Sequence, residues 1–350
     1  MTTVTVNAST KYDVVIGDGL LRDIGIYIKQ IKSKGKLALI SDSNVWPIYG
    51  ETVKNNLISA GYEPIEYVFT AGETSKNMDT YFGIVNFLAE NHVTRSDALI
   101  ALGGGVVGDI TGFAAATFLR GISYIQIPTT LLSMVDSSVG GKTAIDIPAG
   151  KNLIGAFKQP DLVLCDCSTL SSLPSAFFID GCAEVIKYGV LFDPELFLHL
   201  ENFGHTFDRN YVISRCVALK RDVVECDEFD TGVRQKLNLG HTIGHAVEAI
   251  SKFGISHGNG VAIGMSVITK AAAMQNFCDL QLYRRLVAVL EQFQLPVTTQ
   301  FTADALVAHA LSDKKRSGDT LNLIIPVAIG NCIVHPIPVA ELKAFIESGL

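Results

Sequence analysis

The stretch Ala98-Leu-Ile-Ala-Leu-Gly-Gly-Gly-Val-Val-Gly-Asp109 decides the fold, because an apolar run leads into a glycine turn and then into a helical pattern. Glycine lets the backbone approach a pyrophosphate closely, and a helix N-terminus offers N–H groups and a favourable dipole. A glycine turn of this kind also serves close strand–helix packing without a ligand. The stretch therefore favours a phosphate-bearing cofactor and leaves a purely structural turn as the alternative.

Strand and helix patterns alternate on both sides of this stretch. Apolar or alternating runs predict strands, and helical periodicity lies between them. Alternating units of this kind indicate a largely parallel sheet, with ligands at the carboxyl ends of its strands. We therefore expect an α/β domain over residues 1–174. The predicted strands are 3–6, 12–16, 37–41, 67–69, 98–102 and 124–127, and the predicted helices are 45–60, 77–91 and 107–119.

Beyond residue 175 the periodicity is mainly helical. One apolar run near the end, 321–325, predicts a single short strand. We expect an all-α second domain over residues 175–350, with the active site in the cleft between the two domains. The predicted helices are 176–190, 211–226, 237–251, 260–275 and 280–293.

Composition limits the class of protein. The chain has 350 residues, 48% hydrophobic and 18% charged, which suffices for a large core. The net charge of −7 argues against nonspecific nucleic-acid binding. The uncharged stretch 121–135 is shorter than the ~20 residues that span a bilayer, and no signal-peptide pattern is evident at the N-terminus. Seven cysteines without Cys-x-x-Cys indicate reduced core residues, so we expect a cytoplasmic protein with no nucleic-acid or membrane partner.

Polar side chains follow several predicted strands, where a nucleotide would bind. Helix capping is an equally good explanation for the first two groups, and only their convergence at strand ends favours a dinucleotide site. These groups are Asp42-Ser-Asn44, Gly72-Glu73-Thr-Ser-Lys76 and Thr129-Thr130.

Lysines in glycine-rich segments predict an anion site. Asp136-Ser-Ser-Val-Gly-Gly-Lys142-Thr contains Gly-Lys-Thr but lacks the first glycine and the spacer of a P-loop, which excludes an NTPase loop. Gly150-Lys151-Asn152 supplies a second lysine in what reads as a loop. Isolated lysines are usually solvated, but two of them beside an aspartate favour an anionic ligand. Lys220, Arg234 and Asn238 add further donors suited to phosphate or carboxylate.

A histidine motif predicts a metal site. His241 and His245 are four residues apart on one helical face, and His257 follows. Glu184 and Lys187, three residues apart, offer a carboxylate and an ammonium on another helix. Histidines with a carboxylate are the ligands of an open catalytic site, most often for zinc. A satisfied core histidine is the alternative for any one of these residues.

Seven motifs occur in order along the chain, at 103–109, 128–132, 136–142, 150–152, 183–189, 237–245 and 257–265. Together they resemble the 3-dehydroquinate synthase family of sugar-phosphate cyclases over nearly the whole chain. That resemblance implies a Rossmann-like N-terminal domain, an α-helical C-terminal domain, bound NAD⁺ and a divalent metal, zinc or cobalt. It also implies a homodimer in which Arg120 reaches the substrate phosphate of the partner subunit.

The resemblance assigns roles residue by residue. It makes Glu184, His241 and His257 the metal ligands, and it makes His245 a substrate contact rather than the partner of His241. The other implied substrate residues are Arg120, Asp136, Lys142, Asn152, Lys187, Lys220, Arg234, Asn238 and one of Lys314 and Lys315, of which Lys314 is preferred. The implied NAD⁺ contacts are Asp42, Asn44, Glu73, Lys76, Gly104, Gly105, Val106, Val107, Gly108, Asp109, Thr129, Thr130, Lys142, Lys151, Thr169, Leu170, Ser171 and Ser172.

The implied reaction converts 3-deoxy-D-arabino-heptulosonate 7-phosphate to 3-dehydroquinate and phosphate, in the shikimate pathway. Transient oxidation by NAD⁺ acidifies a neighbouring C–H, phosphate is eliminated, hydride returns, and an aldol step closes the ring. One alternative is another cyclase, such as a 2-deoxy-scyllo-inosose or valiolone synthase, although Lys151-Asn152 matches the dehydroquinate pattern. A glycerol dehydrogenase-like enzyme would need no lysine-rich phosphate pocket. A noncatalytic sensor would not need these cations together with an open metal position.

Overall fold

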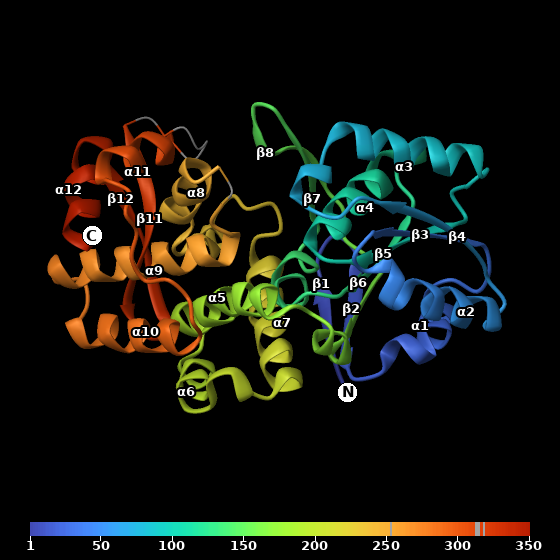
Figure 1. Cartoon of the computed structure of the whole chain (residues 1–350), viewed down its shortest axis with the longest axis horizontal. Coiled ribbons are helices and arrows are strands. Elements are labelled where there is room, and N and C mark those ends of the chain that lie inside the picture. The colour runs from blue at the N-terminus through green and yellow to red at the C-terminus, as the bar shows by residue number, and fades with distance from the viewer. Residues whose placement is uncertain (253, 312–315, 318) are drawn as a thin grey trace. The chain divides into compact units, whose positions relative to one another are not determined.

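The computed structural model describes residues 1–252, 254–311, 316–317 and 319–350 (Figure 1). Lys314 and Lys315 lie outside the described residues. The chain forms two compact units. The first comprises Met1–Pro174 with Arg209–Phe229, and the second comprises Ser175–Asp208 with Asp230–Leu350.

The first unit is built on a seven-stranded sheet in the order β1-β2-β9-β6-β5-β3-β4. The β1–β2 pair is antiparallel, and the other neighbours are parallel. All the strands expected in this region are present, and β9 adds one that the sequence analysis did not predict. The strands are β1 (Thr2–Asn7), β2 (Lys11–Gly17), β3 (Lys36–Asp42), β4 (Glu63–Phe69), β5 (Ala98–Gly103), β6 (Ser123–Pro128) and β9 (Leu162–Asp166).

Helices cover both faces of this sheet, which is why its central strands are apolar runs. Alternate residues of β3 face opposite sides: Leu37 and Leu39 join one core cluster, while Ala38 and Ile40 join the other. Figure 1 shows α1 and α2 on one side of the strands and α3 and α4 on the other. These helices are α1 (Ile24–Ile31), α2 (Glu51–Ser59), α3 (Met78–Glu90) and α4 (Gly105–Thr117).

The strand order places a switch point between β3 and β5. From β3 the chain crosses to β4 on one side and then returns to β5 on the other. In open α/β sheets, ligands bind outside the carboxyl ends of the strands at such a point. Asp42 ends β3 and Gly103 ends β5, so both flank it. We call the carboxyl ends of β3, β5 and β6, with the start of α4, the glycine edge.

Two features of the first unit differ from expectation. Residues 142–157 form an antiparallel hairpin of β7 (Lys142–Ile147) and β8 (Gly150–Phe157), so Lys142 and Lys151 lie on strands and not in glycine-rich loops. Helix α7 (Arg209–Cys226), expected in the second domain, packs against β1, β2 and the turn at Ser133–Ser137. Hydrogen bonds from Asn7 to Glu225, at 2.6 and 3.0 Å, hold its C-terminal end there.

The second unit is mainly helical. Helix α9 is its centre, with 13 of its 18 residues buried, and it packs against α5, α8, α10 and α12. The expected strand is one of three in an antiparallel sheet of β10 (Arg316–Ser317), β11 (Thr320–Ala328) and β12 (Asn331–Pro338). The helices are α5 (Ser175–Phe192), α6 (Pro194–Phe203), α8 (His241–Ile250), α9 (His257–Met274), α10 (Leu280–Gln292), α11 (Ala303–Ala310) and α12 (Val339–Gly349).

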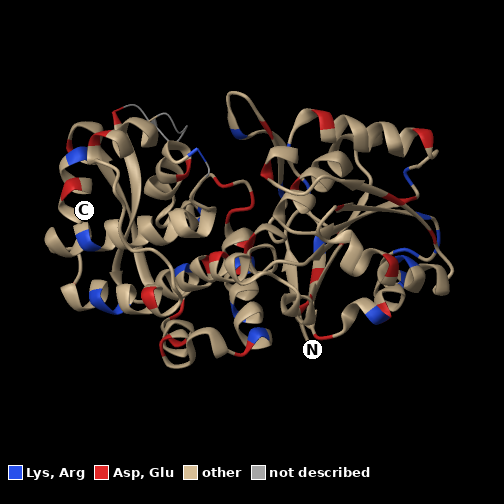
Figure 2. Ribbon diagram, viewed as in Figure 1, with Lys and Arg blue, Asp and Glu red and all other residues tan. Residues whose placement is uncertain are grey.

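Charge is spread along the whole ribbon. Figure 2 shows lysines and arginines interspersed with aspartates and glutamates in both units. Within the described part of the chain, no helix combines the length and the apolar character needed to cross a bilayer.

Candidate active site

Helix α5 carries a buried carboxylate into the second unit. Glu184 is 0% exposed, and Oε2 pairs with Nζ of Lys187 one turn later. Lys187 is itself only 1% exposed. A buried ion is costly unless other groups compensate it, so such a carboxylate indicates a site for cations.

Two imidazoles converge on this carboxylate. His241 begins α8 and His257 begins α9. Their Nε2 atoms lie 3.6 and 3.5 Å from the same oxygen, Oε1 of Glu184. The ligand atoms of these three residues all lie within 4.8 Å of one another. We call Glu184, His241 and His257 the metal cluster.

Both imidazoles are oriented through Nδ1. His241 Nδ1 lies 3.0 Å from the carbonyl oxygen of Leu239, and His257 Nδ1 lies 2.9 Å from Oε1 of Glu248. A hydrogen bond at Nδ1 leaves Nε2 as the nitrogen for a metal. This donor set of two Nε2 atoms and one carboxylate fits zinc or cobalt and leaves further positions open.

The carboxylates of Glu184 and Glu248 also raise the pKa of His257. Burial alone would lower the pKa of His257, but Glu184 and Glu248 outweigh burial and raise the pKa to about 10. A divalent cation bound through His257 would therefore displace a proton at neutral pH.

His245 lies beside the metal cluster. Its ring centroid is 5.3 Å from that of His241 and 6.0 Å from that of His257. A second group of possible ligand atoms consists of His245, Glu248 and His257. Glu248 was not among the predicted site residues, although it follows His245 by three residues and therefore shares its helical face.

In the first unit, close packing explains some glycines of the turn at residues 103–108, whereas others lie where an anion could bind. A Cβ on Gly103 would lie 2.5 Å from Cγ2 of Val107, and one on Gly108 would lie 2.8 Å from Oε1 of Gln126. Close packing therefore explains these two glycines. Gly104 and Gly105 are half-buried at the start of α4, where backbone N–H groups and the helix dipole favour an anion.

A buried lysine connects three segments of the first unit. Lys76, 5% exposed, places Nζ 2.5 Å from Asp109 Oδ2 and 2.6 Å from Asn152 Oδ1. Burial lowers the pKa of Lys76, but Asp109 and Glu73 outweigh burial and raise it. Burial raises the pKa of Asp109. Lys151 pairs with Glu73 at 3.5 Å, so five of the predicted binding residues form one network.

Two of the other expected NAD⁺ contacts at strand ends, Asp42 and Thr129, already make hydrogen bonds within the chain. Asp42 Oδ1 accepts hydrogen bonds from the backbone N–H groups of Asn44 and Val45, at 2.8 and 2.9 Å, so Asp42 itself caps this turn. The Thr129 N–H donates to the Gly103 carbonyl at 3.0 Å. Thr130, half-buried, follows it directly.

The segment Cys167–Ser171 is a short 3-10 helix after β9. Thr169 and Leu170 are buried, and the Thr169 hydroxyl donates to the Asp166 carbonyl at 2.8 Å. Ser171 and Ser172 are exposed. Of these four expected NAD⁺ contacts, the two serines present their side chains at the surface of the first unit.

Another buried lysine of the first unit pairs with an aspartate. Lys220, on α7, is 5% exposed, and its Nζ donates to Oδ1 of Asp136 at 2.8 Å and to the Asp136 carbonyl at 2.5 Å. Lys142 is exposed at the start of β7. The structure therefore joins Asp136 and Lys220, two expected substrate residues that are 84 residues apart in the sequence.

Arg120 is separated from the glycine edge. Helix α4 begins at the carboxyl end of β5, and its 13 residues, about 20 Å long, return the chain to the amino end of β6. Arg120 lies there, exposed, and both Leu119 and Arg120 have positive φ, 51° and 66°. Within one chain, the structure therefore does not bring Arg120 to Gly104 or Thr130.

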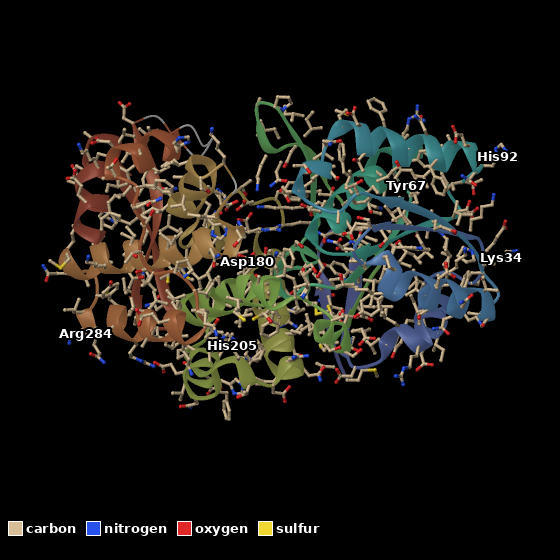
Figure 3. All side chains as sticks on the ribbon, in the orientation of Figure 1. Lys34, Tyr67, His92, Asp180, His205 and Arg284 are labelled. Atoms are coloured by element: carbon tan, nitrogen blue, oxygen red, sulfur yellow. The ribbon has the colours of Figure 1, made fainter. Side chains whose placement is uncertain are left out.

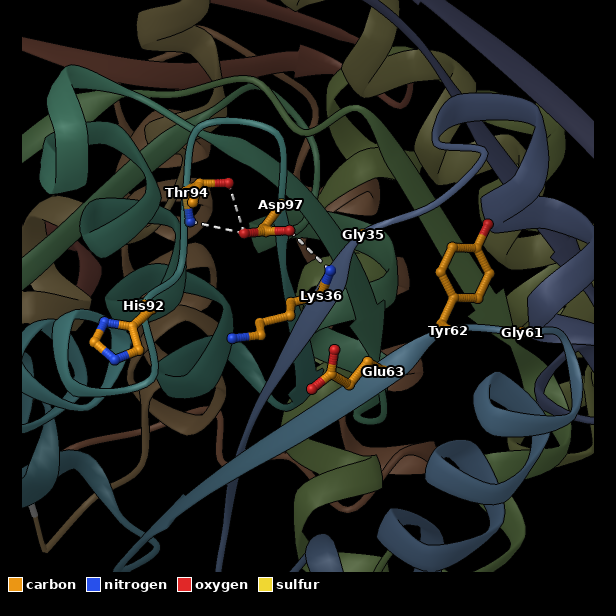
Figure 4. A pocket seen from close by; sticks show the side chains of 8 residues that line it. All are labelled: Gly35, Lys36, Gly61, Tyr62, Glu63, His92, Thr94 and Asp97. Atoms are coloured by element: carbon orange, nitrogen blue, oxygen red, sulfur yellow. Dashed lines mark hydrogen bonds between the residues drawn. The ribbon is translucent and has the colours of Figure 1, made fainter.

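The amino ends of the strands form a hollow of about 480 Å³ (Figure 4). Thr94 and Lys36 saturate the Asp97 carboxylate: Oδ2 accepts from the Thr94 N–H at 2.7 Å and Oδ1 from the Lys36 N–H at 2.8 Å. This hollow lies at the strand ends opposite the glycine edge, and its acidic group is used to hold the chain together. We interpret it as structural.

In the second unit, Arg234 and Asn238 lie on the short 3-10 helix Val233–Asn238. Arg234 is 2% exposed, and the Asn238 amide donates to the Gln235 carbonyl at 3.0 Å. They precede His241, a member of the metal cluster, by seven and three residues in the sequence.

Comparison with known proteins identifies the family. Residues 66–180 match the family model described as 3-dehydroquinate synthase N-terminal, and residues 181–316 match 3-dehydroquinate synthase C-terminal. The chain belongs to the 3-dehydroquinate synthase family. It is 43% identical over 351 residues to the 3-dehydroquinate synthase of Streptococcus suis, covering 98% of this chain and 99% of that one. The enzyme of that name from Enterococcus faecalis is 43% identical, with 96% of each chain covered.

Solved structures agree with the fold and include synthases that are named for other products. A 2-deoxy-scyllo-inosose synthase with carbaglucose-6-phosphate, NAD⁺ and Co²⁺ matches at a TM-score of 0.89 and 25% identity, over 100% of both chains. A 2-epi-5-epi-valiolone synthase from Streptomyces hygroscopicus, with NAD⁺ and Zn²⁺, matches at 0.89 and 26%, over 99% of this chain and 98% of that one. A glycerol dehydrogenase from Schizosaccharomyces pombe, at 0.67 and 16%, over 96% and 88%, shares the fold alone.

Proposed function

We propose that this chain converts 3-deoxy-D-arabino-heptulosonate 7-phosphate to 3-dehydroquinate and phosphate, as a carbon–oxygen lyase that regenerates its NAD⁺ in each turnover. The observation that carries the proposal is the convergence of Glu184, His241 and His257 in a chain 43% identical to 3-dehydroquinate synthases. The structural neighbours with other substrates are only 25–26% identical, which favours the dehydroquinate reaction over theirs.

Two groups supply chemistry that the side chains cannot. When bound, a Zn²⁺ or Co²⁺ ion lowers the pKa of a substrate hydroxyl, and NAD⁺ accepts and later returns a hydride. The metal cluster is the proposed metal site. The backbone N–H groups at Gly104 and Gly105 and the network around Lys76 are the proposed NAD⁺ site, with Asp42, Asn44, Thr129 and Thr130 at the neighbouring strand ends.

The chain's own residues bind and orient an anionic substrate. Lys187 and Lys220 are buried ammonium groups, each held by a carboxylate, and their positions are therefore fixed before substrate arrives. We propose that Lys142 and Arg234 hold anionic groups, since guanidinium and ammonium suit phosphate and carboxylate. Asn152 and Asn238 would add hydrogen bonds, and His245, next to the metal cluster, would contact substrate and move a proton.

Arg120 is proposed to act from a partner subunit. Its position at the amino end of β6, away from the glycine edge, and its exposure favour a role in another copy's site over a role in its own. This assignment requires a homodimer.

We also infer a cytoplasmic location. All seven cysteines lie in the described part of the chain and none forms a disulfide, as expected in a reducing compartment. A dehydrogenase-like or cyclase alternative would differ in products and not in location.

The test is an assay that identifies both products. Purified protein is incubated with 3-deoxy-D-arabino-heptulosonate 7-phosphate, catalytic NAD⁺ and Zn²⁺, and phosphate and 3-dehydroquinate are measured together. We expect equal amounts of both and no accumulation of NADH. Consumption of glucose 6-phosphate or sedoheptulose 7-phosphate instead would favour another cyclase, and NADH accumulation would favour a dehydrogenase.

A further inference from the structure

Glu248 is a buried carboxylate that the proposed reaction does not use. It lies on α8, is 4% exposed, and its Oε1 is 2.9 Å from Nδ1 of His257. A carboxylate without its proton only accepts hydrogen bonds, so Nδ1 of His257 carries the hydrogen in this contact. The other ring nitrogen, Nε2, then faces Oε1 of Glu184 at 3.5 Å.

The contact follows from how α8 and α9 pack. A Cβ on Gly264 would lie 1.9 Å from the carbonyl oxygen of Gly240, and one on Gly244 would lie 2.9 Å from the carbonyl carbon of Gly260. The absence of side chains at these positions lets the two helices approach closely. Residue 240 contacts residue 264, and residue 244 contacts residue 260, so the contacts advance by one turn along each helix in opposite directions. One turn further, residue 248 lies opposite residue 256, next to His257 at the beginning of α9.

Helix α5 fixes the same end of α9 from another side. Asp180 (labelled in Figure 3), one turn before Glu184, accepts hydrogen bonds from the hydroxyl of Ser256 at 2.5 Å and from the Asn259 N–H at 3.1 Å. A Cβ on Gly258 would lie 1.9 Å from the Asp180 carbonyl oxygen. The backbone at His257 is therefore held against α5, and the remaining freedom is rotation of its imidazole ring.

We propose that Glu248 is a positioning residue that fixes this rotation, so that His257 offers Nε2 to the metal shared with Glu184 and His241. Metal-binding histidines commonly donate their second N–H to such a carboxylate, which fixes the tautomer and the ring orientation. The role explains why Glu248 is not itself a ligand, although it groups with His245 and His257. The inference rests on the proposed metal site, and it requires one ion per chain.

The experiment measures metal affinity rather than turnover. Metal-free wild type and Glu248→Gln are titrated with Zn²⁺ against a chromophoric chelator, and Co²⁺ absorption reports coordination at the same site. We expect Glu248→Gln to bind Zn²⁺ about 10–100-fold more weakly and to alter the Co²⁺ spectrum, because a neutral amide is a much weaker partner for the His257 N–H than a carboxylate, and substitutions of such partners have that cost. Glu248→Asp, which keeps the charge, should recover part of the affinity.

Glu201→Gln is the matched control. Glu201 pairs with Arg285 at 2.6 Å in the same unit, on helices that carry no proposed metal ligand. This variant should bind Zn²⁺ as the wild type does. The free energy of unfolding of each metal-free protein is also measured, because a folding defect lowers it whereas a defect in positioning His257 lowers only the Zn²⁺ affinity. If Glu248→Gln does not fold, the comparison of Glu248→Asp with wild type decides.

Each outcome has a distinct meaning. Unchanged Zn²⁺ affinity and an unchanged Co²⁺ spectrum in Glu248→Gln, with active metal-binding wild type, would overturn the role of Glu248 and leave the proposed function intact. Two ions per wild-type chain, one of them lost in Glu248→Gln, would make Glu248 a ligand and overturn the inference. A wild type that binds no metal and forms no 3-dehydroquinate would overturn the proposed function itself.

Discussion

The glycine edge and the metal cluster reach their geometry in different ways. At the glycine edge, the parallel sheet alone brings Asp42, Gly103 and Thr129 to one side, because the strands that they follow are hydrogen-bonded neighbours. In the metal cluster, three helices contribute one side chain each, and only their packing selects the partners. Topology thus determines the first site, whereas close helix contact determines the second, and substitutions should affect the two differently.

The largest effect is expected at the metal cluster, where two variants test whether helix packing or the spacing along α8 selects the metal ligands. His241→Ala should lose metal and lower turnover by about a thousandfold, because a catalytic metal contributes several kcal/mol to the transition state. His245→Ala, on the same helical face, should keep its metal while turnover falls. Metal content by mass spectrometry, together with the phosphate assay, checks both variants. Loss of metal in His245→Ala with retention in His241→Ala would contradict the ligand set.

A second prediction concerns the buried ion pair near the glycine edge. Lys76→Met should destabilise the folded protein by about 3–5 kcal/mol, because it leaves the carboxylate of Asp109, whose side chain is only 19% exposed, without its cation. NAD⁺ affinity should fall as well, while Zn²⁺ binding should stay the same. Chemical denaturation and NAD⁺ titration measure these quantities.

Lys54→Met is the control for this prediction. Lys54 pairs with Glu66 at 2.9 Å, but both side chains are partly exposed, so its loss should cost only about 0–1 kcal/mol. Equal destabilisation by the two variants would show that burial does not distinguish these pairs. A decrease in Zn²⁺ affinity in Lys76→Met would contradict the independence of the two sites.

The smallest effect is expected at the amino ends of the strands, where Asp97 should act on stability alone. Burial raises the pKa of Asp97, but hydrogen bonds from Thr94 and Lys36 outweigh burial and lower it. A lowered folded-state pKa stabilises the protein above the unfolded-state pKa of about 4, and this stability is lost as pH falls through the folded value.

Asp97→Asn should therefore unfold more easily at pH 7 by roughly 1 kcal/mol, and its difference from wild type should shrink below about pH 4. Denaturation measured from pH 7 to pH 3 checks this, with NAD⁺ affinity expected to stay unchanged. A difference that grows as the solution becomes more acidic would contradict the assigned direction of the pKa shift.

The sequence predicted the sheet better than the parts attached to it. Strands β3, β5 and β6 are buried on both faces, and their continuous apolar runs are a direct consequence of that burial. The hairpin of β7 and β8 was missed because its glycines and lysines are equally typical of a loop. Helical periodicity predicted α7 but cannot tell which unit its apolar face will contact.

In the candidate site too, local sequence patterns indicated individual residues but not the partners that tertiary packing gives them. The spacing of His241 and His245 suggested a pair, whereas packing brings His241 to His257 and Glu184, and only the family resemblance indicated that set. The contacts of Lys76 with Asp109 and Asn152 join residues 33 and 76 positions apart, which no local pattern encodes. Glu248 could have been noticed, because it lies two turns after His241 on the same helical face.

The most direct measurement is the structure of the Zn²⁺-loaded protein, with the ion located by anomalous scattering. We predict one zinc ion per chain, bound by Nε2 of His241, Nε2 of His257 and the carboxylate of Glu184, with Nδ1 of His257 hydrogen-bonded to Glu248. An ion bound by His241 and His245, or by His245, Glu248 and His257, would contradict it.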